Sequence, residues 1–174
     1  MTTIAYAGGI MAADSHAQDN FGLRFTADKL HRGQCGANGT AMTWLFGSAG
    51  SNVIAKRLAQ MVRVHLETAP APLNENDSVE YLDRLVFKIN PALEVDKDNE
   101  NSALLAVRNK SITRLYNKQK QGFTPVTIRP YHSIGSGRDY ALAAMFYGKE
   151  APEAVACAME FDAGTGGEIK TIGF

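Results

Sequence analysis

The residue that follows Met1 could act as the nucleophile of a hydrolytic reaction. Thr2 is small enough for a methionine aminopeptidase to expose it by removing Met1. A free N-terminal threonine holds a hydroxyl together with an α-amine whose pKa is about 7.7–8.0, so much of the amine is neutral near pH 7 and can accept the hydroxyl proton. Because many proteins begin with Met-Thr, Thr2 indicates catalysis only if other residues support it.

An aspartate and a lysine could activate that hydroxyl. Two short apolar segments, 2–6 and 10–13, flank a pair of glycines, which predicts a tight hairpin. Such a hairpin brings Asp14, at the end of its second strand, close to Thr2. Lys29 lies in the next expected strand pair, where its charge would lower the pKa of the hydroxyl while Asp14 keeps the lysine charged and oriented. The alternative for this pair is an ordinary surface salt bridge.

Apolar periodicity and turn-forming residues predict the elements that position these side chains. Apolar residues spaced three and four apart predict helices, and Pro70, Pro72 and Pro91 are expected to end the first two of them. We expect strands at 2–6, 10–13, 22–26, 29–32, 41–46, 102–107, 111–116, 127–134 and 168–173, and helices at 53–66, 79–89, 140–147 and 152–161, with 22–26 paired to 29–32. This order favours an α+β fold with two sheets between two layers of helices, a four-layer αββα sandwich, formed by residues 1–174 as a single domain.

Charge and composition exclude several classes of partner. The chain has 18 basic and 18 acidic residues, so its net charge indicates neither nucleic acid nor an anionic membrane. The apolar runs are too short to span a bilayer, and the N-terminus lacks the features of a signal peptide. Cys35 and Cys157 form no CxxC pair, and the histidines show no ligand spacing, so we expect reduced thiols in a cytoplasmic protein without metal or cofactor.

Five short motifs follow one another along the whole chain. They are Thr2-Thr3-Ile4, Ala12-Ala13-Asp14-Ser15, Ala49-Gly50, Ile134-Gly135-Ser136-Gly137 followed by Tyr140-Ala141, and Asp162-Ala163-Gly164-Thr165-Gly166-Gly167. In this order they resemble the proteasome β-subunits and HslV, the bacterial proteasome-like peptidase, with threonine at 165 where serine is usual. The short chain is most similar to a compact bacterial or phage homologue in this group of N-terminal-nucleophile hydrolases.

The resemblance implies a role for each candidate residue of the site. Thr2 would be the nucleophile, and Lys29 and Asp14 would form the activating pair. The backbone N–H of Gly50 would face the developing oxyanion. The three residues that would hold the Thr2 amine and its proton are Ser136, Asp162 and Thr165.

Alternatives remain open for several of these assignments. An apparent insertion between residues 33 and 39 makes Gly47 a competing candidate for the oxyanion donor, and either glycine could merely permit a turn. Ser136 could only cap the next helix, and Asp162 could only end one.

The resemblance also implies an activity and an assembly. We expect a threonine endopeptidase subunit that hydrolyses peptides or unfolded proteins inside homo-oligomeric stacked rings, with an ATPase unfoldase as a further partner. One alternative is a catalytically silent ring or scaffold subunit, which Thr2, Asp14 and Lys29 together argue against. A weaker alternative is an N-terminal amidohydrolase that acts on a small amide.

Overall fold

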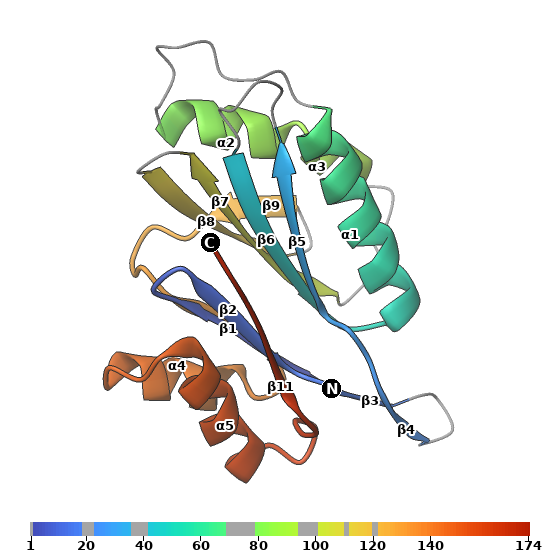
Figure 1. Cartoon of the computed structure of the whole chain (residues 1–174), viewed down its shortest axis with the longest axis vertical. Coiled ribbons are helices and arrows are strands. Elements are labelled where there is room, and N and C mark those ends of the chain that lie inside the picture. The colour runs from blue at the N-terminus through green and yellow to red at the C-terminus, as the bar shows by residue number, and fades with distance from the viewer. Residues whose placement is uncertain are drawn as a thin grey trace.

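The computed structural model describes residues 2–18, 23–35, 42–68, 79–93, 101–109, 112–119 and 122–174, and two main sheets lie between two groups of helices (Figure 1). The elements in chain order are β1 (Thr3–Ala7), β2 (Ile10–Asp14), β3 (His16–Gln18), β4 (Arg24–Thr26), β5 (Leu30–Cys35), β6 (Met42–Ala49), α1 (Asn52–Glu67), α2 (Val79–Phe87), α3 (Asn90–Leu93), β7 (Ser102–Asn109), β8 (Ile112–Gln119), β9 (Gly122–Pro125), β10 (His132–Gly135), α4 (Arg138–Phe146), α5 (Ala151–Phe161) and β11 (Ile169–Gly173).

Both main sheets are antiparallel. One has the strand order β10-β1-β2-β11, and the other has the order β5-β6-β7-β8-β9. The predicted first hairpin is confirmed, because β1 and β2 pair from Ile4 opposite Ala13 to Ala7 opposite Ile10. Its two-residue turn has positive φ angles of 59° at Gly8 and 87° at Gly9, a conformation that glycine adopts without steric cost.

Three apolar clusters separate the four layers. Alternation along β1 sends Ile4 and Tyr6 into the cluster between the two sheets, and sends Ala5 into the cluster beneath α4 and α5. The third cluster joins the outer face of the five-stranded sheet to α1 and α2, and contains Trp44 and Phe46. Figure 1 shows the two groups of helices on opposite outer faces, which confirms the α+β fold and the four-layer αββα arrangement.

The helices carry the expected apolar stripes. α1 buries Leu58, Val62 and Leu66 against the sheet, and α2 buries Leu82, Leu85 and Val86. Within the described parts of the chain, no helix is long and apolar enough to cross a membrane.

The pairing expected between residues 22–26 and 29–32 is wrong. β5 instead pairs with β6, while β4 pairs with β3 in a separate two-stranded sheet. After β2 the chain passes through Ser15 and forms β3, which has an unpaired edge with which residues 24–26 pair as β4. β5 pairs with β6 in the five-stranded sheet. All three residues of β4 are exposed, so this hairpin stands beside the body of the sandwich (Figure 1).

Several other element boundaries also differ from those expected from the sequence. The strand expected at 127–134 is limited to His132–Gly135, because Pro130 lacks an N–H to donate to a ladder. α2 ends at Phe87, and Pro91 lies within α3 instead of ending α2. β9 was not predicted, and β6 continues through Gly47 to Ala49. The expected helix stops at Pro70 and Pro72 lie outside the described residues.

Candidate active site

Thr2 lies at the start of β1 between two clefts. It is only 5% exposed, and it lines one cleft of about 440 Å³ and another of about 380 Å³. The larger cleft reaches Phe25 on β4 and Val53 on α1, and the smaller reaches Arg138 at the start of α4. Clefts of several hundred Å³ are typical of small-ligand and peptide side-chain sites. An extended ligand could therefore lie across Thr2 and enter both clefts.

Asp14 and Lys29 form a buried ion pair at this position. Lys29 Nζ lies 2.9 Å from Asp14 Oδ1, and the two residues are 8% and 1% exposed. Lys29 Nζ also donates a hydrogen bond to the carbonyl oxygen of His16 at 2.5 Å, and Asp14 accepts the N–H groups of Thr3 at 2.8 Å and Gly166 at 3.1 Å. The pair is thus held by β1, β2, β3 and the turn before β11, unlike a surface salt bridge.

Burial changes the proton affinity of Lys29. Desolvation lowers the pKa of its ammonium below the ordinary lysine value, and the hydrogen bond and charge of Asp14 only partly oppose that shift. Lys29 lines the larger cleft together with Thr2. The cleft therefore contains a cation that releases its proton more readily than an exposed lysine does.

A chain of hydrogen bonds leads from the backbone nitrogen of Thr2 to a carboxylate. Thr2 N donates to Ser136 Oγ at 3.4 Å, and Ser136 Oγ donates to Asp162 Oδ2 at 2.6 Å. Thr165 Oγ1 donates to the same Oδ2 at 2.5 Å. Burial acts to raise the pKa of Asp162, but the hydrogen bonds from Ser136, Thr165 and the N–H of Gly164 outweigh it and lower that pKa.

The two capping alternatives are decided by this geometry. The N-cap of α4 is Gly137, not Ser136, whose hydroxyl proton goes to Asp162. Asp162 does end α5 as its C-cap residue, and its Oδ1 accepts the N–H of Gly164 at 3.1 Å. Asp162 therefore combines a turn-forming role with its contact to Ser136.

The structure also separates the two glycine candidates. Gly50 has a φ of +128° and lines both clefts together with Thr2. Gly47 lies inside β6, where an added Cβ would come within 3.0 Å of side chains of Ile4, Leu30 and Met11 between the two sheets. Gly47 is thus required by packing, while Gly50 is the glycine that faces the space beside Thr2.

Gly50→Ala should destabilise the protein more than Gly148→Ala. Both glycines have positive φ, but a Cβ on Gly148 would meet nothing within 4 Å, whereas one on Gly50 would lie 1.7 Å from Oδ1 of the buried Asn101. We expect Gly148→Ala to lower the free energy of unfolding by about 1–2 kcal/mol, the cost of the left-handed conformation, and Gly50→Ala to lower it further. Denaturant unfolding measures both losses, and equal losses would contradict the crowding at Asn101.

Thr3 is part of the site, although the sequence analysis gave it no role. Its hydroxyl lies 2.6 Å from Thr165 Oγ1 and accepts the N–H of Gly137 at 3.1 Å. Because the one hydroxyl proton of Thr165 goes to Asp162, Thr3 supplies the proton of the Thr3–Thr165 bond. The available signal was a threonine at the start of an otherwise apolar strand, since a buried hydroxyl needs a partner.

Ser15 is a second missed residue. Its Oγ accepts the N–H of Glu168 at 2.8 Å, and an added Cβ on Gly167 would lie 2.6 Å from the same oxygen. Gly167 has a φ of +83°. Ser15 thereby attaches the turn that carries Thr165 to the end of β2.

The sequence and the structure were both compared with those of known proteins, and only the structural comparison finds matches. No protein-family profile and no curated protein sequence matches the chain. Solved structures do match: Anbu, an ancestral β-subunit, from Yersinia bercovieri has a TM-score of 0.70 at 18% identity, covering 99% of this chain and 80% of that one.

Two further solved structures agree with the first. BPH from Thiobacillus denitrificans, in complex with epoxomicin, has a TM-score of 0.61 at 19% identity and covers 98% of this chain and 96% of its own. HslV from Trypanosoma brucei has a TM-score of 0.67 at 19% identity, covering 99% and 100%. Identities this low establish architecture alone, and on that basis the chain has the proteasome-like N-terminal-nucleophile hydrolase fold.

Proposed function

We propose that this chain is a threonine peptidase subunit that hydrolyses peptide bonds with Thr2 after Met1 has been removed. The observation that carries the proposal is the meeting of Thr2 with a buried Asp14–Lys29 pair and with the Ser136–Asp162 hydrogen bond at one point between two clefts. Met1 lies outside the described residues, and its removal is part of the proposal.

In this proposal hydrolysis at Thr2 has two steps, formation of an acyl ester and its hydrolysis by water. First, the neutral α-amine accepts the hydroxyl proton as the oxygen attacks the substrate carbonyl, and the resulting ammonium passes that proton to the leaving amine. An ester then joins Thr2 to the acyl half of the substrate. Second, the α-amine takes a proton from water as the water attacks the ester, and the resulting ammonium returns that proton to the Thr2 oxygen as the ester bond breaks. This releases the carboxylic acid and restores both the hydroxyl and the neutral amine.

The surrounding residues lower the barrier to these steps. Charged Lys29 lowers the pKa of the Thr2 hydroxyl and stabilises the developing alkoxide, and Asp14 orients the lysine. The N–H of Gly50 stabilises the oxyanion of the tetrahedral intermediate. The carboxylate of Asp162, acting through Ser136, stabilises the ammonium that forms on Thr2, and Thr165 helps to keep that carboxylate ionised.

The substrate class follows from the shape of the site. Clefts on both sides of Thr2 favour an extended peptide, and a folded protein cannot present its backbone in that way. Unfolded proteins and peptides are the substrates in this proposal. Its remaining parts, homo-oligomeric stacked rings and an ATPase unfoldase as partner, rest on the resemblance of the sequence motifs to ring peptidases.

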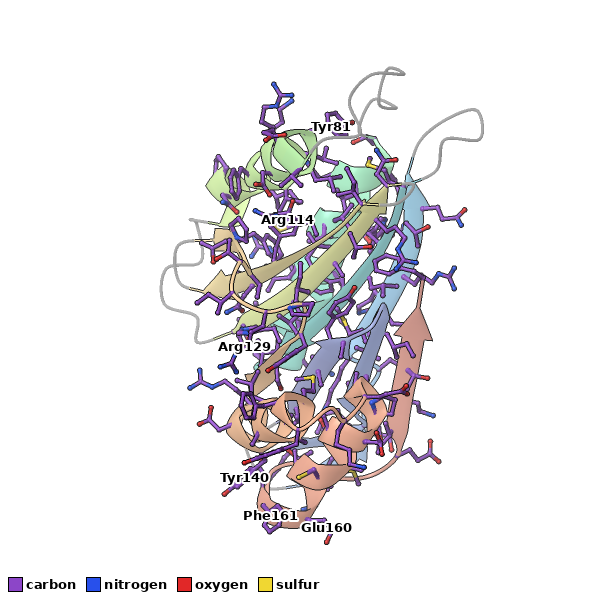
Figure 2. All side chains as sticks on the ribbon, turned by 90° about the vertical axis from the view of Figure 1, so that its left-hand side faces the viewer. Tyr81, Arg114, Arg129, Tyr140, Glu160 and Phe161 are labelled. Carbon is purple, nitrogen blue, oxygen red and sulfur yellow. The ribbon has the colours of Figure 1, made fainter. Side chains whose placement is uncertain are left out.

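Exposed aromatic side chains support assembly. Tyr140 and Phe161 stack at 5.5 Å between ring centroids at the outer end of α4 and α5 (Figure 2). Phe146 and Tyr147, at the end of α4, are 62% and 82% exposed. Exposed large apolar side chains of this kind are typical of protein–protein contact sites.

A silent ring subunit is the alternative, and retention of Met1 would favour it. With Met1 attached, the nitrogen of Thr2 belongs to a peptide bond and cannot act as a base. The same chain would then assemble without hydrolysing peptides.

Epoxomicin should modify Met1-free protein at Thr2. As a peptide epoxyketone, it reacts with a hydroxyl and an amine of the same residue, which only an N-terminal threonine or serine offers. Intact mass and peptide mapping should find one adduct per subunit, at Thr2, in a sample that sediments as a multi-subunit species. A form with an N-terminal extension should remain unmodified. An adduct at Ser136 or Cys157 would contradict the assignment of Thr2, and Met1-free assemblies without any adduct would favour the silent subunit.

A further inference from the structure

A third cavity, distinct from the two clefts beside Thr2, lies at the other end of β1. It has a volume of about 250 Å³ and is formed by the β1–β2 turn, the β7–β8 hairpin and the segment 126–130. Tyr6, on its wall, is four residues from Thr2 along the strand, about 13 Å at 3.3 Å per residue. The cavity shares no lining residue with either cleft beside Thr2.

Three arginines line this cavity, and none of its lining residues is acidic. Arg114 is neutralised by Asp83, with Nε–Oδ1 and Nη2–Oδ2 distances of 3.1 and 3.2 Å. Among the described residues, Arg108 and Arg129 form no ion pair with a carboxylate. Two of the three arginines that line this cavity are therefore not held in an ion pair with a carboxylate of the described residues.

Neutral groups hold these two arginines in place. The guanidinium of Arg108 lies 4.3 Å from the ring centroid of Phe174, and its Nε donates to Thr113 Oγ1 at 2.9 Å. Arg129 lies 5.7 and 5.6 Å from the ring centroids of Tyr131 and Phe146. Aromatic faces attract and orient a guanidinium but leave its charge uncancelled. Arg114 and Arg129 both lie on the face turned toward the viewer in Figure 2.

Two hydroxyl groups add neutral hydrogen-bonding capacity to the wall. Thr113 contributes a hydroxyl beside Arg108, and Tyr6 contributes a phenol. Burial raises the pKa of Tyr6, although the charge of Arg108 and a hydrogen bond from the Gly9 backbone oppose it. The phenol is therefore protonated at neutral pH and can donate a hydrogen bond to an acceptor in the cavity.

We propose that this cavity binds one oxyanion group, a carboxylate or a phosphate, between the guanidinium groups of Arg108 and Arg129. Guanidinium groups bind both anions through parallel N–H donors, and arginines that are already oriented lose little side-chain entropy on binding. A volume of about 250 Å³ exceeds that of several waters at about 30 Å³ each, which leaves room for a tetrahedral phosphate. The bound anion would form ion pairs with these two guanidinium groups.

Calorimetric titration with inorganic phosphate, at constant ionic strength set by chloride, tests the proposal. Phosphate should bind saturably, and Arg129→Met and Arg108→Met should each weaken binding by about tenfold or more, as expected for losing a charged hydrogen-bond donor. Arg63→Met is the matched control, because Arg63 is exposed on α1 beside Glu67 and should leave binding unchanged. If Arg108→Met fails to fold, the exposed Arg129 still carries the test.

A parallel titration with acetate distinguishes the two kinds of oxyanion. Saturable binding of acetate that requires Arg129 would assign a carboxylate ligand, and binding of phosphate alone would assign a phosphoryl ligand. Heats that do not exceed those of added chloride, or that are unchanged in Arg129→Met, would overturn the proposal.

Discussion

Thr2→Ala should abolish peptide hydrolysis while the protein still folds and assembles. The substitution keeps the backbone, and alanine is also small enough for Met1 to be removed, so the free amine remains. Only the hydroxyl nucleophile and a methyl group are lost. We expect turnover of a fluorogenic peptide to fall by about 10⁴-fold or more, to background, as it does when a hydrolase loses its nucleophile. Sedimentation and thermal unfolding should change little.

Thr2→Ser separates the effect of losing the hydroxyl from the effect of losing the methyl group. Serine keeps both the nucleophile and the free amine, so part of the activity should remain. Intact mass must show Met1 removed from both variants before rates are compared. Hydrolysis that persists in Thr2→Ala would mean that another group performs the reaction, and the proposed peptidase site would then be wrong.

Lys29→Met should reduce turnover by about 10²–10³-fold, the loss expected when one electrostatic stabiliser of a developing oxyanion is removed. Methionine keeps much of the length of the side chain but removes the charge that lies 2.9 Å from Asp14 Oδ1. Without that charge the pKa of the Thr2 hydroxyl rises and the alkoxide loses its stabilising cation. Turnover of the same fluorogenic peptide, measured on Met1-free protein, gives the loss.

Lys29→Met could also lower turnover by destabilising the fold, so the free energy of unfolding has to be measured beside turnover. Removing one partner of a buried ion pair costs about 3–5 kcal/mol, because the other charge stays buried and uncompensated. The double variant Asp14→Asn with Lys29→Met removes both charges, so it should regain most of the lost free energy of unfolding. It should not regain turnover. If the double variant, or Lys29→Met alone, hydrolyses the peptide at a near-normal rate, the pair is only structural.

The pH dependence of stability gives an independent readout of Lys29. Burial lowers its pKa in the folded protein, so the unfolded chain binds more protons between that pKa and the ordinary lysine value of about 10.4. The free energy of unfolding contributed by Lys29 therefore rises with pH through this window. The rise should be absent in Lys29→Met, and an unchanged profile would contradict the shift.

Local signals in the sequence predicted the first hairpin and part of the site. A two-residue turn of glycines determines which residues of 2–6 and 10–13 face each other, so the closeness of Asp14 to Thr2 could be inferred without a structure. Helix positions followed from apolar spacing in the same way, because an apolar stripe must be buried. The β3–β4 pairing was missed, because that pairing depends on which sheet edges are already occupied.

The sequence by itself determined most of the order of the elements, the four-layer class and the candidates Thr2, Asp14 and Lys29, since turns, apolar periods and the position after Met1 are local properties. Only the tertiary structure decided which distant groups meet. Ser136 lies 134 residues from Thr2 and reaches it through the pairing of β1 with β10. Gly47 is packed between the two sheets within β6, and β6 ends only at Ala49, so Gly50 is the glycine that lines the clefts. The arginine-lined cavity likewise depends on three segments brought together by sheet packing, and no short-range pattern encodes that contact.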